Sequence, residues 1–267
     1  MKSLYKYVSY INKGYNETII DCHAHMFSTS GSINYPYECP VSGYIAMVDN
    51  PIRYPERSLF DEFKTYIDMG EVTRNKPLLC VGKDVDETQR IYNEFTDKIC
   101  GFGEIKCYKR CSFGGQVIEH YDTSILHSVL NKGLPVFIHW DLDGKHDDEL
   151  YNIIKSNPDT KFVLCHCGFG EMCNHDDVFE KMIVFQYKLP NLWLSMSWIT
   201  LDYFVNNDGC IKHDKLSAIP NPDRVIVGTD INPQLDPHGK IFKHRYDKFI
   251  KLAPKFNVVQ ALNNLFP

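Results

Sequence analysis

The stretch Ile19-Ile20-Asp21-Cys22-His23-Ala24-His25-Met26-Phe27 places two histidines, one residue apart, directly after an apolar run. In a β-strand, residues i and i+2 point to the same face. We therefore expect His23 and His25 to present two imidazoles side by side at the carboxyl end of a strand. Imidazole nitrogen is the commonest protein ligand for zinc and related ions. For a single histidine the alternative is a buried ring satisfied by one hydrogen bond, so the rest of the chain has to decide.

Later stretches place further metal-ligand types in the same setting. Three apolar runs end in His139, in His166 and in Asp230. A further run carries Glu104 and Lys106 on one face of a probable strand. For any single histidine, a buried ring satisfied by one hydrogen bond is a better explanation than a ligand, but in a parallel barrel the carboxyl ends of the strands converge on one face. The predicted shared metal site consists of His23, His25, Glu104, His139, His166 and Asp230.

Short apolar runs alternate with longer amphipathic segments along the chain. The expected strands are residues 18–23, 43–48, 78–82, 100–106, 135–139, 161–166, 192–197 and 224–229. The expected helices are residues 55–69, 86–95 with Asp86 as N-cap, 123–131, 147–155, 176–187, a segment within 202–218, 246–252 and 258–265. This alternation implies parallel strands with helical crossovers, and eight units over about 250 residues are the size of a (β/α)8 TIM barrel. We expect an α/β fold with one such domain; the alternative, an open doubly wound sheet, lacks its Gly-rich phosphate loop here.

Composition and charge narrow the class of protein. Of the 267 residues, 43% are hydrophobic and 24% are charged, which is typical of a globular protein. The net charge of −5 provides no general attraction to nucleic acid or to an anionic membrane. No apolar run reaches the roughly 18–20 residues of a membrane span, and the N-terminus lacks the apolar core of a secretory signal. We expect a cytoplasmic protein with a small-molecule substrate, without nucleic-acid or membrane partners; a homo-oligomer is compatible with the sequence.

The cysteines are expected to be reduced thiols, as is usual in the cytosol. Half of the ten lie in apolar, strand-like runs, where free cysteine behaves as a small hydrophobe: Cys22, Cys80, Cys100, Cys165 and Cys167. The run Cys165-His166-Cys167 could also be a thiolate metal site. Strand alternation opposes that interpretation, because both cysteines point away from the pocket if His166 points into it.

The ligand pattern resembles the amidohydrolase superfamily of metal-dependent hydrolases. That family carries His-x-His after the first strand, Lys or Glu on the fourth, His on the fifth and sixth, and Asp on the eighth. Our expected strands place the six candidate ligands in the same order and on the same strands. The ending Ala261-Leu262-Asn263-Asn264-Leu265-Phe266 is similar to the Asn-Ala-x-x-Leu-Phe ending of the branch that contains aminocarboxymuconate semialdehyde decarboxylase. The resemblance covers about residues 17–267, which leaves residues 1–16 as an N-terminal extension.

The number of metal ions stays open in the sequence. Gly103-Glu104-Ile105 is similar to the Gly-Glu-Ile motif of the metal-dependent DNases, in which the glutamate bridges two metals. Many decarboxylases of the other branch use one metal and no carboxylate on the fourth strand. We therefore expect one or two divalent ions, with zinc favoured by four histidines together with carboxylates.

In such a site, each ligand has an expected role. His23, His25 and Asp230 hold the more buried ion, while His139 and His166 hold a second ion with Glu104 as the bridge. Asp230 is the candidate general base, although an N-cap or turn residue is the alternative. With a single ion, His166 could instead polarise a carbonyl group. The leading function is a hydrolase of a small ester, amide, lactone or phosphoester; the alternatives are a metal-dependent non-oxidative decarboxylase and a non-catalytic metal-binding protein.

Substrate contacts are expected in the segments next to the carboxyl ends of the strands. The candidates are Lys106, Tyr108, Trp140, Trp198 and Arg53, together with Tyr35, Tyr37, Asp141 and Asp143. For each of them, packing or a solvated loop is the competing explanation. Lys106 could instead form a salt bridge with Glu104, or be carboxylated as the bridging ligand.

Overall fold

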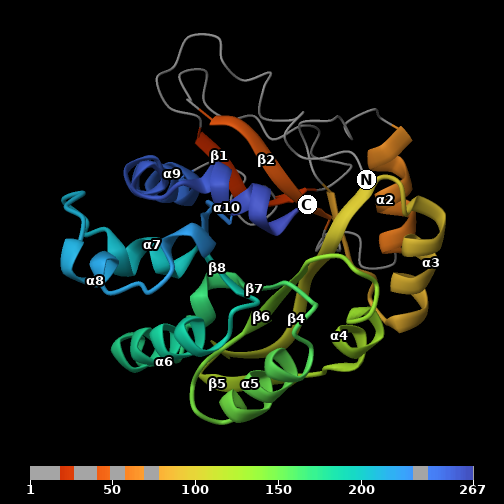
Figure 1. The fold of residues 1–267 in the computed structure, drawn as a ribbon, viewed down its shortest axis with the longest axis horizontal. Helices are drawn as coiled ribbons and strands as arrows, with labels where there is room; N and C mark the ends of the chain where they lie inside the picture. The colour runs from red at the N-terminus through yellow and green to blue at the C-terminus, as the bar shows by residue number, and fades with distance from the viewer. Residues whose placement is uncertain (1–18, 27–40, 49–57, 69–77, 231–239, 267) are drawn as a thin grey trace.

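The computed structural model describes residues 19–26, 41–48, 58–68, 78–230 and 240–266. Eight parallel strands pair in the order β1-β2-β3-β4-β6-β7-β8-β9 (Figure 1). Their bounds are β1 Ile19–Met26, β2 Val41–Val48, β3 Leu78–Cys80, β4 Ile99–Phe113, β6 Val136–Trp140, β7 Phe162–Leu164, β8 Leu192–Met196 and β9 Val225–Val227. Just beyond β9, the N–H of Asp230 donates a hydrogen bond to the carbonyl of His23 over 2.8 Å. The sheet therefore returns to β1, and the predicted (β/α)8 barrel is confirmed.

Helices surround these strands, mostly where their amphipathic patterns predict them (Figure 1). They are α2 Leu59–Asp68, α3 Val85–Phe95, α4 Ser124–Val129, α5 Asp147–Ser156, α6 His175–Lys188, α7 Ile199–Phe204, α8 His213–Ser217, α9 Lys240–Leu252 and α10 Val258–Leu265. The segment expected within 202–218 is two short helices, of which α7 begins earlier. The N-cap of α3 is Asp84, whose carboxylate accepts the N–H of Glu87, so the expected cap at Asp86 is wrong. Asp86 lies in the first turn, where its negative charge interacts favourably with the positive end of the helix dipole.

A hairpin extends from the fourth strand of the barrel and was not predicted. Strand β4 continues past residue 106 to Phe113 and pairs antiparallel with β5, Gln116–Tyr121. Gly114 and Gly115 connect the two strands with φ of +58° and +80°. A two-residue Gly-Gly connection between strands is a recognised hairpin signal, because both positions need positive φ. The hairpin lengthens β4 well beyond the barrel.

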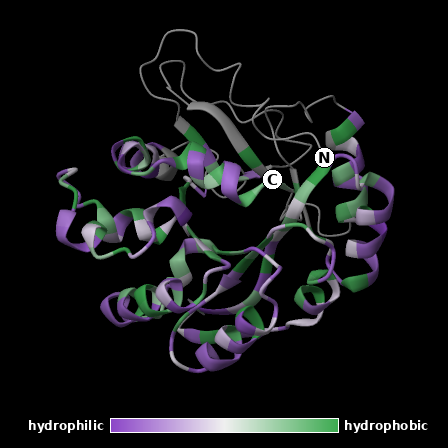
Figure 2. Cartoon of the chain, viewed as in Figure 1, coloured by the Kyte–Doolittle hydropathy of each residue, from purple (hydrophilic) through white to green (hydrophobic). Residues whose placement is uncertain are grey.

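Apolar side chains fill the barrel and the layer between strands and helices. The largest fully buried side chains include Phe102, Phe137 and Phe162, which lie on neighbouring strands. Strands buried on both faces read as nearly continuous apolar runs, which explains the pattern of the sequence. The ring of helices carries both hydrophobic and hydrophilic residues (Figure 2). No helix in the described ranges is both long and apolar enough to cross a membrane.

Short 3-10 segments complete the described structure, and one of them changes the site. They are η2 Cys165–Gly168, η3 Pro222–Arg224 and η4 Ala253–Lys255. Strand β7 ends at Leu164, and the chain enters η2 before it reaches His166. The expected strand over 161–166 is therefore shorter, and His166 follows the strand instead of belonging to it.

Candidate metal centre

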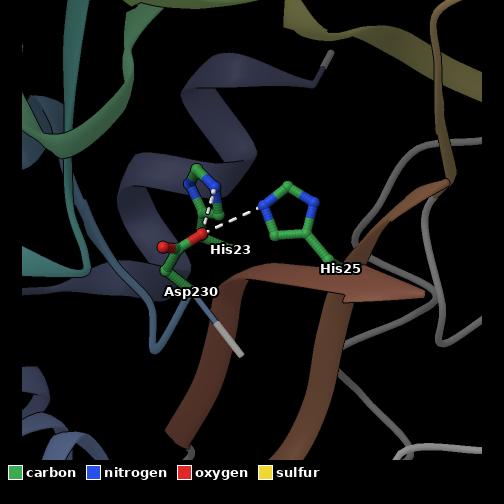
Figure 3. Close-up of side chains that lie close together, drawn as sticks. All are labelled: His23, His25 and Asp230. Atoms are coloured by element: carbon green, nitrogen blue, oxygen red, sulfur yellow. Dashed lines mark hydrogen bonds and ion pairs between the residues drawn. The ribbon is translucent and has the colours of Figure 1, made fainter. Parts of the chain in front are cut away.

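Two histidines of β1 face the carboxylate that follows β9. His25 Nε2 lies 3.0 Å from Asp230 Oδ1, and His23 Nε2 lies 3.3 Å from the same oxygen (Figure 3). Both imidazoles are buried. Asp230 has a φ of +56°, and its backbone N–H is held by the His23 carbonyl. Two nitrogens and one oxygen thus converge on one point at the carboxyl end of the barrel.

Glu104 of β4 connects this corner to the other histidines. Its Oε1 lies 3.0 Å from His166 Nε2 and 3.1 Å from His139 Nδ1. The same oxygen is 4.0 Å from His23 Nε2, while Glu104 Oε2 is 3.8 Å from His25 Nε2. All four histidines therefore surround one buried carboxylate. Together with Asp230, the six side chains predicted to meet do lie together.

The charges of the cluster depend on one another because the groups are buried. Burial by itself raises the pKa of Glu104, but His166 and His139 hold that pKa well below its usual range. Burial likewise opposes ionisation of Asp230, whose pKa is nevertheless lowered well below its usual range by His166, His23 and His25. For His139, burial lowers the pKa, yet Glu104 and Asp141 raise it to about 9. Both carboxylates are thus ionised at neutral pH and available to a cation.

The donor set fits a divalent ion. Two groups of three residues have ligand atoms that all lie within 4.8 Å of one another: His23, His25 and Asp230 in one, and His23, Glu104 and His166 in the other. His23 Nε2 is buried, and although Asp230 Oδ1 lies 3.3 Å away, the nitrogen makes no well-formed hydrogen bond in the described part of the chain. An unsatisfied buried nitrogen is costly unless something else binds it. Nitrogen and carboxylate oxygen are the ligands that zinc takes in proteins.

The second ligand group differs from the predicted one in a single histidine. His139 was expected beside His166, but the compact group contains His23 in its place. The His139 ring instead lies between two carboxylates, with Nδ1 3.1 Å from Glu104 Oε1 and Nε2 3.2 Å from Asp141 Oδ1. The sequence could not reveal this arrangement, because the orientation of the ring depends on Asp141.

The 3-10 segment η2 corrects the expectation for the cysteines. His166 and Cys167 have φ of 52° and 54°, so strand alternation does not apply to them. Burial first, and then the charge of Glu104, raise the pKa of the Cys165 thiol well above its usual value. Cys165 is therefore near the pocket carboxylate instead of pointing away from it. Cys167 does point elsewhere, since its thiol donates to the Ser195 carbonyl over 3.4 Å. Neither cysteine belongs to a ligand group within the described residues.

Two serines on β8 and just after it support the histidine rings, and sequence reasoning missed them. His166 Nδ1 lies 2.9 Å from Ser197 Oγ. His23 Nδ1 lies 3.3 Å from Ser197 Oγ and 3.4 Å from Ser195 Oγ. Partners at Nδ1 orient a ring and leave Nε2 for the metal. The signal was present, because the alternating run Leu192-Trp193-Leu194-Ser195-Met196-Ser197 places both hydroxyls on one face.

A second set of missed residues fixes the junction between β1 and Asp230. Asp21 Oδ1 accepts the backbone N–H groups of His23 and Thr229, and its Oδ2 accepts the Thr229 hydroxyl over 2.6 Å. A Cβ on Gly228 would lie 2.5 Å from both Cβ and N of His23, so only glycine allows this approach. Arg245 of α9 donates to the Asp230 carbonyl over 3.2 Å. This corner of the candidate metal centre is thus held by side chains from β1, from the segment after β9 and from α9.

Two of the predicted substrate contacts lie in the interior of the protein. Tyr108 and Trp140 are completely buried. The Tyr108 hydroxyl donates a hydrogen bond to Asp143 over 2.9 Å, so the carboxylate of Asp143, another candidate, already has a partner within the protein. Trp198 is half-buried, and its ring centre lies 5.1 Å from that of His166, so it borders the centre.

The remaining candidates have mixed outcomes. Lys106 is exposed whereas Glu104 is buried, so the two do not share an environment. The register between β4 and β6 shifts on both sides of residues 105 and 106, which disrupts simple alternation. Asp141 is buried beside His139. Arg53, Tyr35 and Tyr37 lie outside the described residues.

Comparison with known proteins supports this picture of the fold. A family model described as Amidohydrolase matches residues 100–236, just over half of the chain. The apo structure of Agrobacterium tumefaciens ATU3138 is similar with 12% identity and a TM-score of 0.59, over 96% of this chain and 95% of the other. A zinc-bound amidohydrolase of Burkholderia multivorans has 11% identity and a TM-score of 0.54, over 91% and 94%. A putative 2-pyrone-4,6-dicarboxylic acid hydrolase of Pseudomonas putida has 15% identity and a TM-score of 0.52, over 94% and 99%. No curated protein matches the sequence.

Proposed function

The chain belongs to the amidohydrolase family, and we propose that it is a metal-dependent hydrolase of a small ester, amide, lactone or phosphoester. The observation that carries the proposal is the position of Glu104. Its Oε1 lies 3.0 Å from His166 Nε2 and 4.0 Å from His23 Nε2, between the two sets of candidate ligands. A carboxylate placed in this way suits a bridge between two ions, and paired ions suit hydrolysis.

Zinc is the ion that we propose, at one or two per chain. The nitrogen and oxygen donors of the cluster favour it, and the Burkholderia neighbour contains bound zinc. A divalent ion bound there would be a Lewis acid that could lower the pKa of a bound water toward about 7 and polarise the substrate oxygen. His23, His25 and Asp230 would hold it at the β1 corner, and Glu104, His139 and His166 would complete the centre.

Asp230 is the proposed general base. Its side chain is partly exposed, at 15%, while the side chains of His23 and His25 are almost completely buried. It would accept a proton from the attacking water and pass it to the leaving group. The hydrogen bonds to its backbone N–H and carbonyl keep the carboxylate aimed at the cluster. His166, whose pKa is lowered by burial, would be a neutral ligand, or would orient the substrate carbonyl in a centre with one ion.

A non-oxidative decarboxylase is the second candidate, and one observation favours it. Both compact ligand groups contain His23, and a single Nε2 binds one ion at a time. A centre with one ion would agree with the decarboxylase-containing branch, to which the C-terminal run 261–266 is similar. A non-catalytic metal-binding protein is the third alternative, in which Asp230 would be a ligand only.

Three further expectations are part of the proposal. Residues 17–267 would form the single catalytic domain, and residues 1–16 an extension of it. The protein would be cytoplasmic, which agrees with the free thiols of eight cysteines in the described ranges. Its partner would be a small-molecule substrate, and its assembly state would have to be measured.

The test combines metal analysis with a substrate panel. Purified protein is stripped with a chelator, reloaded with zinc, manganese or nickel, and analysed for metal per chain. Each form is then assayed on matched esters, amides, lactones and phosphoesters, and on carboxylic acids with detection of released carbon dioxide. We expect one to two ions per chain and hydrolysis that disappears with the chelator and returns with the metal. Carbon dioxide release without hydrolysis would establish the lyase, and an inert, fully loaded protein would contradict both.

A further inference from the structure

One lysine near the candidate metal centre has no anionic partner in the described part of the chain. Lys109 lies on the part of β4 that extends beyond the barrel, and its side chain is half-buried. Its Nζ is 5.5 Å from the centre of the Trp198 ring. Within the described residues, no carboxylate lies within ion-pair distance of this ammonium group. The next residue, Arg110, differs in that it lies 2.7 Å from Asp143 and 3.9 Å from Glu119.

The backbone around Lys109 is fixed to a residue of the centre. The peptide groups on its two sides both bind Asp141: the Asp141 N–H donates to the Tyr108 carbonyl over 3.1 Å, and the Arg110 N–H donates to Asp141 Oδ2 over 2.7 Å. The other oxygen of Asp141, Oδ1, is 3.2 Å from His139 Nε2. The position of Lys109 is therefore tied to the candidate ligand His139 through one buried carboxylate.

Trp198 lies close both to Lys109 and to two of the histidines. Its ring centre lies 5.1 Å from that of His166 and 6.4 Å from that of His139. The ammonium group thus lies one aromatic ring away from the centre, at the end of the barrel where the ligands converge. A half-buried ammonium group normally needs an anion or full hydration, and contact with an aromatic face compensates for only part of that need.

We propose that Lys109 binds an anionic group of the substrate, a carboxylate or a phosphate, while the reacting bond lies at the metal centre. The placement of the reacting bond at the metal centre rests on the proposed function. Trp198 would pack against the part of the substrate between its anionic group and the reacting bond. Lys109 would therefore determine specificity, because a substrate without the anionic group leaves the ammonium without a partner.

Binding is tested with probes that share one carboxylate. The zinc-loaded chain is titrated by calorimetry with succinate, glutarate and adipate, and with the monoamide of each, in which the second carboxylate is replaced. We expect Lys109→Gln to raise the Kd of the best dicarboxylate about 10-fold or more, the usual scale for a hydrogen bond to a charged group. The Kd of its monoamide should stay the same, and Lys109→Arg should restore most of the affinity for the dicarboxylate.

A matched control and a second anion complete the design. Lys155→Gln on α5 removes a different lysine, which is exposed and whose Nζ lies 5.7 Å from the Tyr151 ring centre, and should change neither Kd. A phosphonate analogue, 3-phosphonopropionate, separates the two anion sources: a larger Lys109 effect than for succinate assigns a phosphate, and a smaller one a carboxylate. Equal losses for dicarboxylate and monoamide would overturn the proposal, as would no loss, or no binding of any probe to the unaltered protein.

The experiments distinguish a failure of the proposed function from a failure of the anion site. If the dicarboxylates bind through Lys109 but no compound of the panel is hydrolysed, the anion site stands and the hydrolase does not. Suppose instead that neutral esters are hydrolysed, and that Lys109→Gln changes kcat/KM by the same factor for anionic and neutral substrates. The hydrolase then stands and the anion site does not. In the expected case, Lys109→Gln raises KM for the anionic member and leaves kcat nearly unchanged.

Discussion

The metal centre and the β4–β5 hairpin both contain groups of opposite charge, but in different surroundings. In the centre, the side chains of Glu104 and His166 are 4% and 3% exposed and lie 3.0 Å apart. On the hairpin, Glu119 contacts Lys145, whose side chain is 52% exposed. Burying a charge costs several kcal/mol unless it is compensated, whereas an exposed ion pair is worth roughly 0–1 kcal/mol. The comparison indicates that a fold tolerates concentrated buried charge where a cation can complete the bonding, which is expected of a functional centre.

The apolar residues of the two regions also differ in burial. Around the centre, apolar side chains such as Met196 and Val227 are fully buried. On the hairpin, Phe113, Val117 and Ile118 are exposed. Changes in the centre should therefore alter metal content and catalysis together, while changes at these three exposed hairpin residues should alter neither.

The largest effect is expected for Asp230→Asn. If Asp230 is the base, turnover per bound metal should fall by roughly 10²–10⁴-fold, the scale of general acid–base catalysis. His139→Asn should act differently, by lowering metal occupancy. Turnover on a substrate from the panel is therefore divided by the metal content of each variant. Near-normal turnover per metal in Asp230→Asn would exclude the proposed base.

The second prediction concerns Glu104→Gln, which keeps the shape of the side chain and removes its charge. As a bridge between two ions, Glu104 should be needed for the second one, so the metal content should fall from two per chain to one. Turnover should fall by at least the 10–100-fold that outer-shell partners typically cost. Elemental analysis and steady-state kinetics provide the readouts. A content of one ion both before and after the change, with carbon dioxide release retained, would favour the decarboxylase.

The third prediction compares two glycines, one in each region. An alanine at Gly228 would meet backbone and Cβ atoms of His23 at 2.5 Å, and overpacking of this kind typically costs about 1–3 kcal/mol. Gly114 has open space around it and a φ of +58°, so alanine there should cost about 1–2 kcal/mol through backbone conformation alone. Urea unfolding measures both costs. Only Gly228→Ala should also lose zinc, and equal zinc contents in the two variants would show that the approach to His23 does not shape the centre.

The smallest effect is expected for Lys145→Ala, which removes the exposed pair with Glu119. The free energy of unfolding should change by less than about 1 kcal/mol, and the change should shrink further in high salt because exposed pairs are screened. Urea titrations at low and high salt test this. A loss of several kcal/mol, or a loss of zinc, would mean that the hairpin is coupled to the centre more strongly than the contrast implies.

Much of the fold was predictable because its signals are local. The strand that carries His23 and His25 reads as a short apolar run, and the helices read as amphipathic segments between such runs. The hairpin was missed although Gly114-Gly115 marks its turn, because residues beyond 106 are less apolar and its second strand, β5, is exposed throughout. The extent of η2 was missed as well, since nothing local indicates positive φ at His166 and Cys167.

The sequence by itself determined the types of donor and their order: histidines, a glutamate and an aspartate at the ends of successive strands. Only the tertiary structure decided which donors meet. It placed Glu104 between His166 and His139, and turned Cys165 toward that carboxylate. It also tied Lys109 to the centre through Asp141. The physical reason is that period-two alternation is a property of one extended strand, whereas these contacts depend on barrel closure, on register shifts between strands and on backbone that is not extended.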